Sequence, residues 1–391
     1  MRLRSPLRIL AALALLAGGL LPSLAAADEV GVTSDTILFG QVAALEGPSA
    51  ALGQSMRQGL LAAFTEINAK GGIHGRKLKL VSRNDGYDPD RSVVETVKLI
   101  YEDKVFALIG AVGTPTAMAT APIAAANDVP FIGPVSGAEF LNGPEFQNVV
   151  NIRARYKAEA EAWIKHLVED LHQSRIGIFY QDDAYGRDVL AGVKAALDRR
   201  GMELTAEGTF ERNTRAVGAA FRMIKRAEPD AVIMVGTYGP CAEFIKLSHR
   251  SGFNPTFAAA SFVGGTALAK ELGREGAGII VSQVVPFPWD TRLKLVADYQ
   301  AAQKALDPSQ TPDFQSLEGY IVGRVVGRAL ELAGPNPTRS DLLRVINDVG
   351  KFDIGGDIIA FGAMRQTHPP EVFLTQIQSD GSFKPVERLT N

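Results

Sequence analysis

The sequence predicts an α/β protein built of two doubly wound, Rossmann-like lobes. Short apolar and β-branched runs alternate with longer segments of helical period along nearly the whole chain, which is typical of a parallel sheet with helices on both faces. The alternation starts afresh after NVVNIRAR (148–155), and one sheet seldom holds this many strands. The 391 residues also suffice for two domains of ordinary size.

The N-terminal segment predicts export. Arginines precede an apolar run over 9–21, Pro22 ends this run, and small residues follow up to Ala27. This order is that of a signal peptide, so we expect residues 1–27 to be cleaved after Ala27. The alternative is a membrane anchor, but the run is shorter than the roughly 20 apolar residues that span a bilayer.

The first lobe begins with a strand at TILFGQVA (36–43) and a helix that starts near Gly53. In this helix apolar residues recur at helical spacing, and Gly71 is a typical stop. Asp88 is a suitable cap for a second helix whose first residue is Pro89. Three further strands are predicted in this lobe, at KLKLVSRND (77–85), VFALIGAV (105–112) and VPFIGPV (129–135).

The second lobe repeats the pattern, and the chain returns to the first lobe near 284–288, where Pro286 and Pro288 cannot donate to a sheet. The final strands, near 357–363 and 371–378, can return to either lobe. The second lobe's strands are predicted at RIGIFYQD (175–182), AVIMVGTY (231–238), TFAAASF (256–262) and GIIVSQVV (278–285). The predicted lobes are therefore 28–153 with 285–357, and 154–284 with 358–391.

Composition and motifs argue against several functions. The net charge is −2 with 21% charged residues, whereas nucleic-acid binding calls for a basic stripe. The histidines lack metal-ligand spacing and no G-x-S-x-G elbow occurs, so we expect no metal, no cofactor and no enzyme activity. Cys241 suits a buried position better than a reactive one, and the acidic NDGYDPDRS segment (84–92) suits helix capping better than calcium binding.

Polar side chains follow several predicted strands: Thr114, Ser136, Tyr185, Tyr238 and Ser261. In open α/β sheets, ligands bind beyond the carboxyl ends of the strands. If both lobes face one cleft, these five side chains converge on it. The sequence therefore predicts a binding site between the lobes.

Thr114 is the most specific of these residues. Gly113 precedes it and Pro115 suits a first helical position, so we expect Thr114 to be the N-cap. The helix start would offer N–H groups, and Thr114 its hydroxyl, to a carboxylate. Taken alone, this segment favours the alternative that Thr114 merely caps its own helix. A phosphate loop is disfavoured because GAVGTPT lacks the P-loop lysine and spacing.

Several stretches together resemble the type I periplasmic solute-binding proteins of the leucine/isoleucine/valine-binding group. The most diagnostic are INAKGGIHGRKL (67–78) and DGYDPDRSV (85–93), and FALIGAVGTPTAMATAP, DVPFIGPVSGAEFL, FYQDDAYGRD and MVGTYGPCAEFI also match. The resemblance implies two lobes joined by a three-stranded hinge that close on a small ligand. It further implies a periplasmic protein that delivers this ligand to the membrane permease of an ABC importer. We expect this protein to be a monomer.

The resemblance also implies roles for single residues. Thr114 would bind the ligand carboxylate with Ser136 nearby, and the Val135 carbonyl would accept from the ligand ammonium. Gly137 stands where the group often has threonine, and because glycine has no side chain it can offer the ligand only its backbone N–H. The second-lobe tyrosines Tyr185 and Tyr238 would close over the ligand, and Leu52 stands where an aromatic residue often lines the side-chain pocket.

Ser261 departs from this pattern, because amino-acid binders of the group tend to have a glutamate near here that pairs with the ligand ammonium. A buried ammonium without a compensating charge is costly. Either another acid such as Glu46 or Asp183 takes that role, or the ligand is a carboxylate without an amine.

Two rival functions stay open at this stage. A sensory module could use the same fold to report a ligand to a receptor or regulator. An exported α/β enzyme is the other rival, and the missing catalytic motifs disfavour it.

Overall fold

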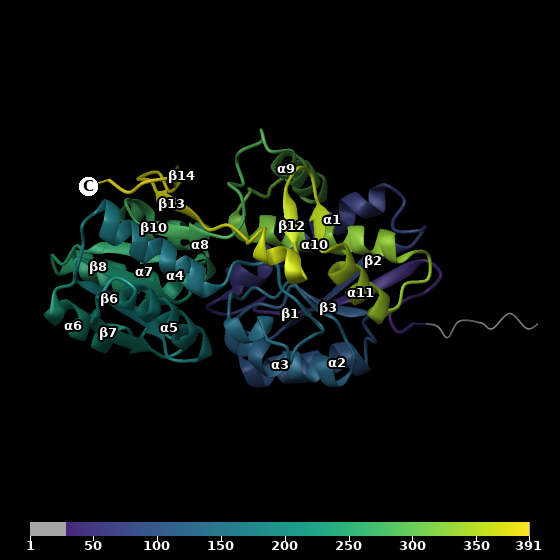
Figure 1. Ribbon diagram of the computed structural model, residues 1–391, viewed down its shortest axis with the longest axis horizontal. Helices are drawn as coiled ribbons and strands as arrows, with labels where there is room; N and C mark the ends of the chain where they lie inside the picture. Colours follow the sequence, from purple (N-terminus) through teal and green to yellow (C-terminus); the bar gives the residue numbers. More distant parts are fainter. Residues whose placement is uncertain (1–28, 391) are drawn as a thin grey trace, which may run out of the picture.

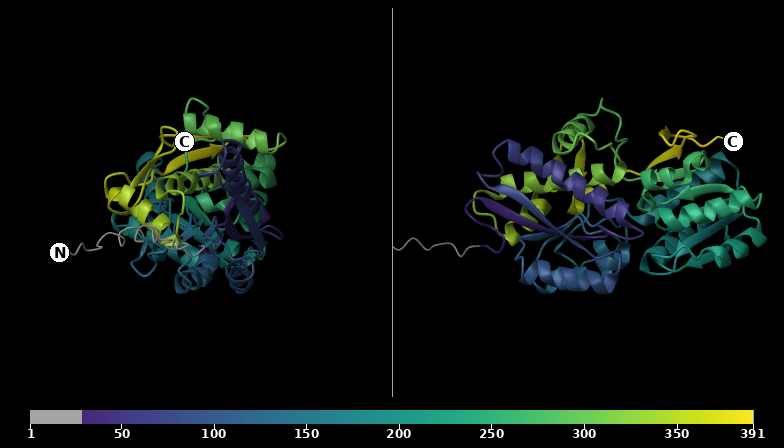
Figure 2. Two further views of the ribbon diagram at one scale, coloured as in Figure 1. Left: turned by 90° about the vertical axis from the view of Figure 1, so that its right-hand side faces the viewer. Right: turned by 180° about the vertical axis from the view of Figure 1, so that it is seen from behind.

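The computed structural model describes residues 29–390, so the predicted signal peptide lies outside the described residues. Two α/β lobes lie side by side, each around its own sheet (Figure 1). Seen from behind, the C-terminal strands lie on the second lobe (Figure 2). The predicted fold class is confirmed.

The first lobe contains a five-stranded parallel sheet in the order β2-β1-β3-β4-β5. Helices α2 and α3 lie on one side of it, and α1, α10 and α11 on the other (Figure 1). The strands are β1 (Thr36–Ala43), β2 (Lys77–Asn84), β3 (Ala107–Ile109), β4 (Phe131–Ile132) and β5 (Val149–Val150). The helices are α1 (Ala50–Ala69), α2 (Pro89–Tyr101), α3 (Thr114–Ala126), α9 (Lys294–Leu306), α10 (Phe314–Ala333) and α11 (Arg339–Val349), with a 3-10 turn at Glu139–Asn142.

Helices α1 and α10 cross so closely that glycine is required at their contact. A Cβ at Gly59 would lie 1.8 Å from Ser316 O, and one at Gly319 would lie 2.4 Å from Met56 O. Because side chains longer than glycine would push the helices apart, these positions fix the place of α10. The N-terminus of α10 is thereby held at the boundary between the lobes.

The second lobe contains a seven-stranded sheet in the order β14-β13-β10-β9-β8-β6-β7, in which only β13 runs opposite to the other strands. Its strands are β6 (Ile176–Gln181), β7 (Leu204–Phe210), β8 (Ala231–Val235), β9 (Thr256–Ala259), β10 (Ile280–Gln283), β13 (Phe373–Ile377) and β14 (Phe383–Val386). Its helices are α4 (Tyr156–Lys165), continued by a π turn at His166–Asp170, then α5 (Ala184–Asp198), α6 (Gly218–Ala227), α7 (Tyr238–Arg250) and α8 (Gly265–Leu272), with 3-10 turns at Ser261–Val263 and Gly273–Gly276.

The chain passes between the two sheets three times: between β5 and α4, between β10 and α9, and before β13. The third crossover follows β12 (Ile358–Ala360), which pairs with β11 (Lys351–Asp353) and leads into a 3-10 turn (Gly362–Gln366). Arg365 of this turn donates to Asn151 O at 2.8 Å and to Arg153 O at 2.6 Å. The third crossover therefore braces the first. The predicted lobe boundary at 358 separates β12 from its partner β11.

The lobes contact each other directly away from the crossovers. Gln181 Nε2 donates to the hydroxyl of Tyr87 at 3.0 Å, and Asn213 Nδ2 donates to Gly86 O at 3.0 Å. In both pairs one residue belongs to each lobe. The structure therefore shows the lobes closed on one another.

Candidate functional site

Three hydroxyls gather where the first lobe meets the second. Thr114 Oγ1 lies 2.7 Å from Ser136 Oγ and 3.3 Å from the hydroxyl of Tyr156. All three side chains are buried, and burial raises the pKa of Tyr156 to about 12. The cluster therefore presents neutral hydroxyl groups beside the N-terminus of α3, where unpaired N–H groups favour an anion.

The sequence predicted Thr114 as the N-cap of α3, and this prediction is wrong. Gly113 holds that position with a φ of 107°, and Thr114 is the first helical residue. A Cβ at Gly113 would lie 2.3 Å from the ring of Tyr87, which explains why glycine stands there. Because the Thr114 hydroxyl points to Ser136 and Tyr156, the interpretation that it merely caps its own helix is wrong as well.

The neighbouring loop places Val135 and Gly137 beside the hydroxyls. Val135 O accepts from Gly113 N at 3.3 Å, which leaves one lone pair of this carbonyl for another donor. A Cβ at Gly137 would lie 2.7 Å from Ala154 O and 2.8 Å from Tyr156 N. The first crossover and Tyr156 thus occupy the space that a side chain at position 137 would need.

Tyr185 faces this cluster from the second lobe. Its side chain is fully buried, and its ring lies 5.2 Å from the ring of Tyr156 and 4.9 Å from that of Phe262. Burial raises the pKa of Tyr185 well above its ordinary value, so the hydroxyl stays protonated. This hydroxyl has no hydrogen-bond partner among residues 29–390, although buried tyrosine hydroxyls usually find one.

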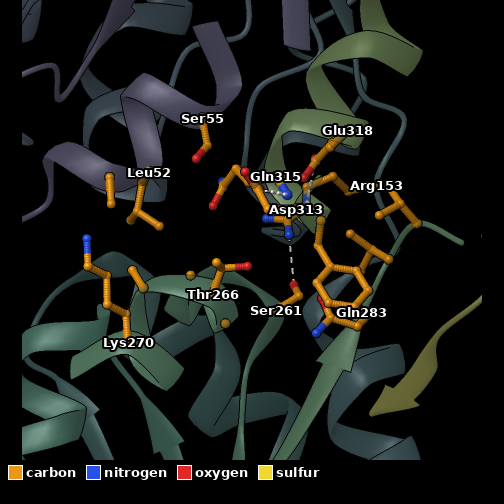
Figure 3. Close-up of a pocket in the computed structure, with 17 residues that line it drawn as sticks. Leu52, Ser55, Arg153, Ser261, Thr266, Lys270, Gln283, Asp313, Gln315 and Glu318 are labelled. Atoms are coloured by element: carbon orange, nitrogen blue, oxygen red, sulfur yellow. Dashed lines mark hydrogen bonds and ion pairs between the residues drawn. The ribbon is translucent and has the colours of Figure 1, made fainter. Parts of the chain in front are cut away.

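A cavity of about 180 Å³ lies between the lobes to one side of the hydroxyl cluster. Of the residues predicted for the site, Leu52 and Ser261 line it, whereas Thr114, Ser136 and Tyr185 do not. Tyr238 adjoins it: its hydroxyl lies 3.5 Å from Ala51 N, at the start of α1. The cavity is also lined by Ser55, Arg153, Lys270, Asp313, Gln315 and Glu318 (Figure 3).

A buried network of charges meets at Ser261. Glu159 accepts from Ser261 N and from Ser261 Oγ, both at 2.9 Å, and Arg153 Nη2 donates to the same hydroxyl at 2.7 Å. Arg153, in the first crossover, places its Nε 3.0 Å from Glu318 Oε1 on α10 of the first lobe. Burial raises the pKa of Glu318, and the positive charge of Arg153 offsets only part of this effect. One arginine is therefore enclosed by two acids.

Neither acid suggested from the sequence lies next to Ser261. Glu46 is exposed and its carboxylate lies 3.4 Å from Asn84 Nδ2. Asp183 caps α5 by accepting from Tyr185 N and forms a 3.0 Å ion pair with Arg212. The acid that contacts Ser261 is Glu159 on α4.

Sequence reasoning missed four residues of this region: Arg153, Tyr156, Glu159 and Glu318. For Arg153 the sequence held a signal. A charged side chain is rarely buried without a partner, so an arginine in a predicted crossover between lobes indicates a contact with a residue of either lobe. Tyr156 and Glu159 are three residues apart at the start of a helix, a spacing that puts both on one face. No local pattern marks Glu318, which lies within α10.

Three other features would bear on function: a metal site, a reactive cysteine and a membrane-spanning helix. Residues 29–390 hold no group of three or more histidine, cysteine, aspartate or glutamate side chains that could bind a metal. Cys241 is fully buried, and burial raises the pKa of its thiol, which fits an unreactive thiol. No helix within the same range is long and apolar enough to cross a membrane.

Known proteins resemble the chain over most of its length. The periplasmic binding protein family model matches residues 36–382. The Leu/Ile/Val-binding protein BraC3 of Rhizobium johnstonii is 26% identical over 303 residues, which are 76% of this chain and 80% of that protein. The leucine-specific-binding protein of Salmonella typhimurium is 23% identical over 285 residues, or 73% of this chain and 77% of its own.

A solved structure confirms the same relationship. A possible leucine/isoleucine/valine-binding protein from Rhodopirellula baltica superposes with a TM-score of 0.85 at 37% identity and covers 93% of this chain and 100% of its own. The resemblance noted in the sequence is therefore confirmed. The chain belongs to the periplasmic binding protein family, whose members bind solutes and are not enzymes.

Proposed function

We propose that this protein captures a small carboxylate-bearing solute between its lobes and delivers it to the membrane permease of an ABC importer. The observation that carries the proposal is the hydroxyl cluster of Thr114, Ser136 and Tyr156 at the start of α3, opposite the unpartnered hydroxyl of Tyr185. Four protonated hydroxyls beside a helix N-terminus suit an anion that only accepts hydrogen bonds.

The relatives support a small organic acid as the ligand. They are named for binding leucine, isoleucine or valine, each of which carries one carboxylate and an apolar side chain. In this chain Leu52 supplies an apolar wall next to the polar groups. The carboxylate would exchange the internal hydrogen bonds among the hydroxyls for hydrogen bonds to its own oxygens.

The mechanism we propose is closure of the lobes on the bound acid. The first lobe would hold the carboxylate at Thr114 and Ser136 while the lobes are apart, and closure would then bring Tyr185 onto it. Closure excludes water, and a hydrogen bond to a charged group becomes stronger in the drier interior. The contacts of Tyr87 with Gln181 and of Asn213 with Gly86 would hold the closed form.

Substitution of Thr114 tests the proposal. Thr114→Ala should weaken the binding of leucine or 4-methylvalerate by about 1.5–3 kcal/mol, since a hydrogen bond to a charged group is lost. This corresponds to a roughly 10- to 150-fold higher Kd by titration calorimetry. The control is Thr116→Ala, because Thr116 Oγ1 donates only to backbone carbonyls of its own helix start. Equal affinities of the two variants for every acid bound by the wild type would refute the carboxylate site.

A further inference from the structure

The cavity beside the hydroxyl cluster holds polar atoms that lack hydrogen-bond partners within the described chain. They are Nε and Nη1 of Arg153, Nε2 of Gln315 and Oε1 of Glu318. Arg153 is 2% exposed, Glu318 3% and Gln315 8%, so water does not reach these atoms freely. Leaving a buried polar group unpaired costs about 1–3 kcal/mol, so a cavity that gathers several is suited to a polar ligand group.

Arg153 is held in place by other contacts while Nη1 stays available. Nη2 donates to Ser261, and Nε lies 3.0 Å from Glu318 Oε1. The Nε–Glu318 contact is an ion pair without the alignment of a hydrogen bond, because both atoms still lack a hydrogen-bond partner within residues 29–390. The guanidinium is therefore positioned by its neighbours, and both it and Glu318 keep unused hydrogen-bonding capacity.

Gln315 adds a second donor on the same wall. It lies in the first turn of α10, where its backbone N–H donates to Asp313, the N-cap, at 2.7 Å. The side-chain amide is free of this capping role. Figure 3 shows Arg153, Asp313, Gln315 and Ser261 gathered in the middle of the cavity, with Lys270 at the opposite side.

Side chains of both charge signs line the cavity. Arg153 and Lys270 carry positive charge, and Asp313 and Glu318 carry negative charge. Glu159 lies behind Ser261 and adds a further negative charge close by. A second carboxylate would meet these acids, and an ammonium would meet Arg153 at close range. A neutral group avoids both costs.

We propose that the cavity binds a neutral primary carboxamide, carried at the end of the ligand opposite its carboxylate. Arg153 Nη1 and Gln315 Nε2 donate to the carboxamide oxygen, and Glu318 Oε1 accepts from its NH₂ group. The group matches both the free donors and the free acceptor, and it adds no charge to the cavity. This inference rests on the proposed function for the carboxylate end. The cavity of about 180 Å³ suits a small end group, because it is below the roughly 300–1,000 Å³ of drug-sized sites.

Titration calorimetry on matched ligands tests the carboxamide. The monoamides of succinic, glutaric and adipic acid are compared with the diacids, ω-amino acids and unbranched fatty acids of matched length. At one chain length or more, the monoamide should bind at least about tenfold more tightly than each matched partner, since it alone satisfies the free donors and acceptor. Equal or tighter binding by the fatty acid, diacid or amino acid at every length would overturn the proposal, as would binding of none of them.

Two near-isosteric variants locate the group. Gln315→Met removes one donor, and Glu318→Gln replaces an acceptor by a donor. Each should reduce the preference for the monoamide over the fatty acid by about five- to tenfold. Gln303→Met is the matched control, because Gln303 is buried on α9 outside the cavity and donates to Thr311 O. It should lower stability without changing the preference. An unchanged preference in both cavity variants would overturn the assignment.

The two proposals can fail separately. If Thr114→Ala weakens all acids but the monoamide holds no advantage, the carboxylate site stands and the carboxamide site falls. If Thr114→Ala changes nothing while butyramide still binds in a manner sensitive to Gln315→Met, the carboxylate site falls and the carboxamide site stands.

Discussion

An aromatic cluster joins the two lobes beside the cavity. Phe383 of β14 stacks on Trp289 with ring centroids 5.9 Å apart and meets Phe314 of α10 edge-on at 5.3 Å. Trp289 lies in the second crossover and also packs against Phe314, at 5.5 Å. Since β14 belongs to the second sheet and α10 to the first lobe, the contact of Phe383 with Phe314 must be lost when the lobes separate.

Replacing Phe383 by alanine should therefore destabilise the closed form in particular. An aromatic pair contributes about 0.5–1.5 kcal/mol beyond the burial of area. If closure accompanies binding, the variant loses this energy from the closed, bound state, whereas the open state has no such contact to lose. The apparent Kd should therefore rise by about 2- to 13-fold.

Calorimetry with the tightest-binding acid measures this change, and the fluorescence of Trp289 follows the same contact. Phe352→Ala is the matched control, because Phe352 is 2% exposed and packs edge-on against Phe361, which follows its partner strand β12 in the first lobe. Both variants should lower Tm, but only Phe383→Ala should weaken binding. If the two variants bind with equal affinity, the cluster does not contribute to closure and the reasoning is wrong.

Two further predictions concern buried polar groups. Tyr185→Phe should raise the unfolding free energy by about 1 kcal/mol in urea denaturation, because an unpartnered buried hydroxyl is removed, while it weakens binding of acids; lower stability would contradict this. Burial raises the pKa of Asp85 to about 6, so the folded state retains a proton that the unfolded chain releases. Stability should fall by about 2 kcal/mol as pH rises from 4 to 6, and this fall should be absent in Asp85→Asn; parallel pH profiles would contradict it.

The elements with local signals were predictable from the sequence. The first strand was predicted at 36–43 and is found there, because its β-branched and apolar residues follow the polar Ser34 and Asp35. Asp88 caps α2 as predicted, with its side chain accepting from Arg91 N at 3.0 Å and Pro89 as first helical residue. Thr114 shows the limit of such signals. The motif placed the helix start within one residue, but only the packing of Tyr87 on Gly113 decides which residue is the cap.

The site depends on contacts between distant segments, which one sequence does not encode locally. Arg153 and Ser261 are 108 positions apart, and Glu318 comes from another lobe segment altogether. The position of Ser261 after a strand marked it as a candidate, but its partner Glu159 comes from a helix that lies beside it only once the chain is folded. Glu46 and Asp183 were plausible because they follow strands, and they face other partners.

The same helix lies beside Gly137 and Ser261, two of the positions that depart from the family pattern. Gly137 stands where the group often has a threonine, and Tyr156 brings a hydroxyl to within 3.3 Å of Thr114 Oγ1 beside it. Ser261 stands where a glutamate is common, and Glu159 brings a carboxylate to 2.9 Å from its hydroxyl. Tyr156 and Glu159 share one face of the first turn of α4. Because α4 begins directly after the first crossover, its side chains reach both lobes, and one rigid element places a hydroxyl beside Thr114 and a carboxylate beside Ser261.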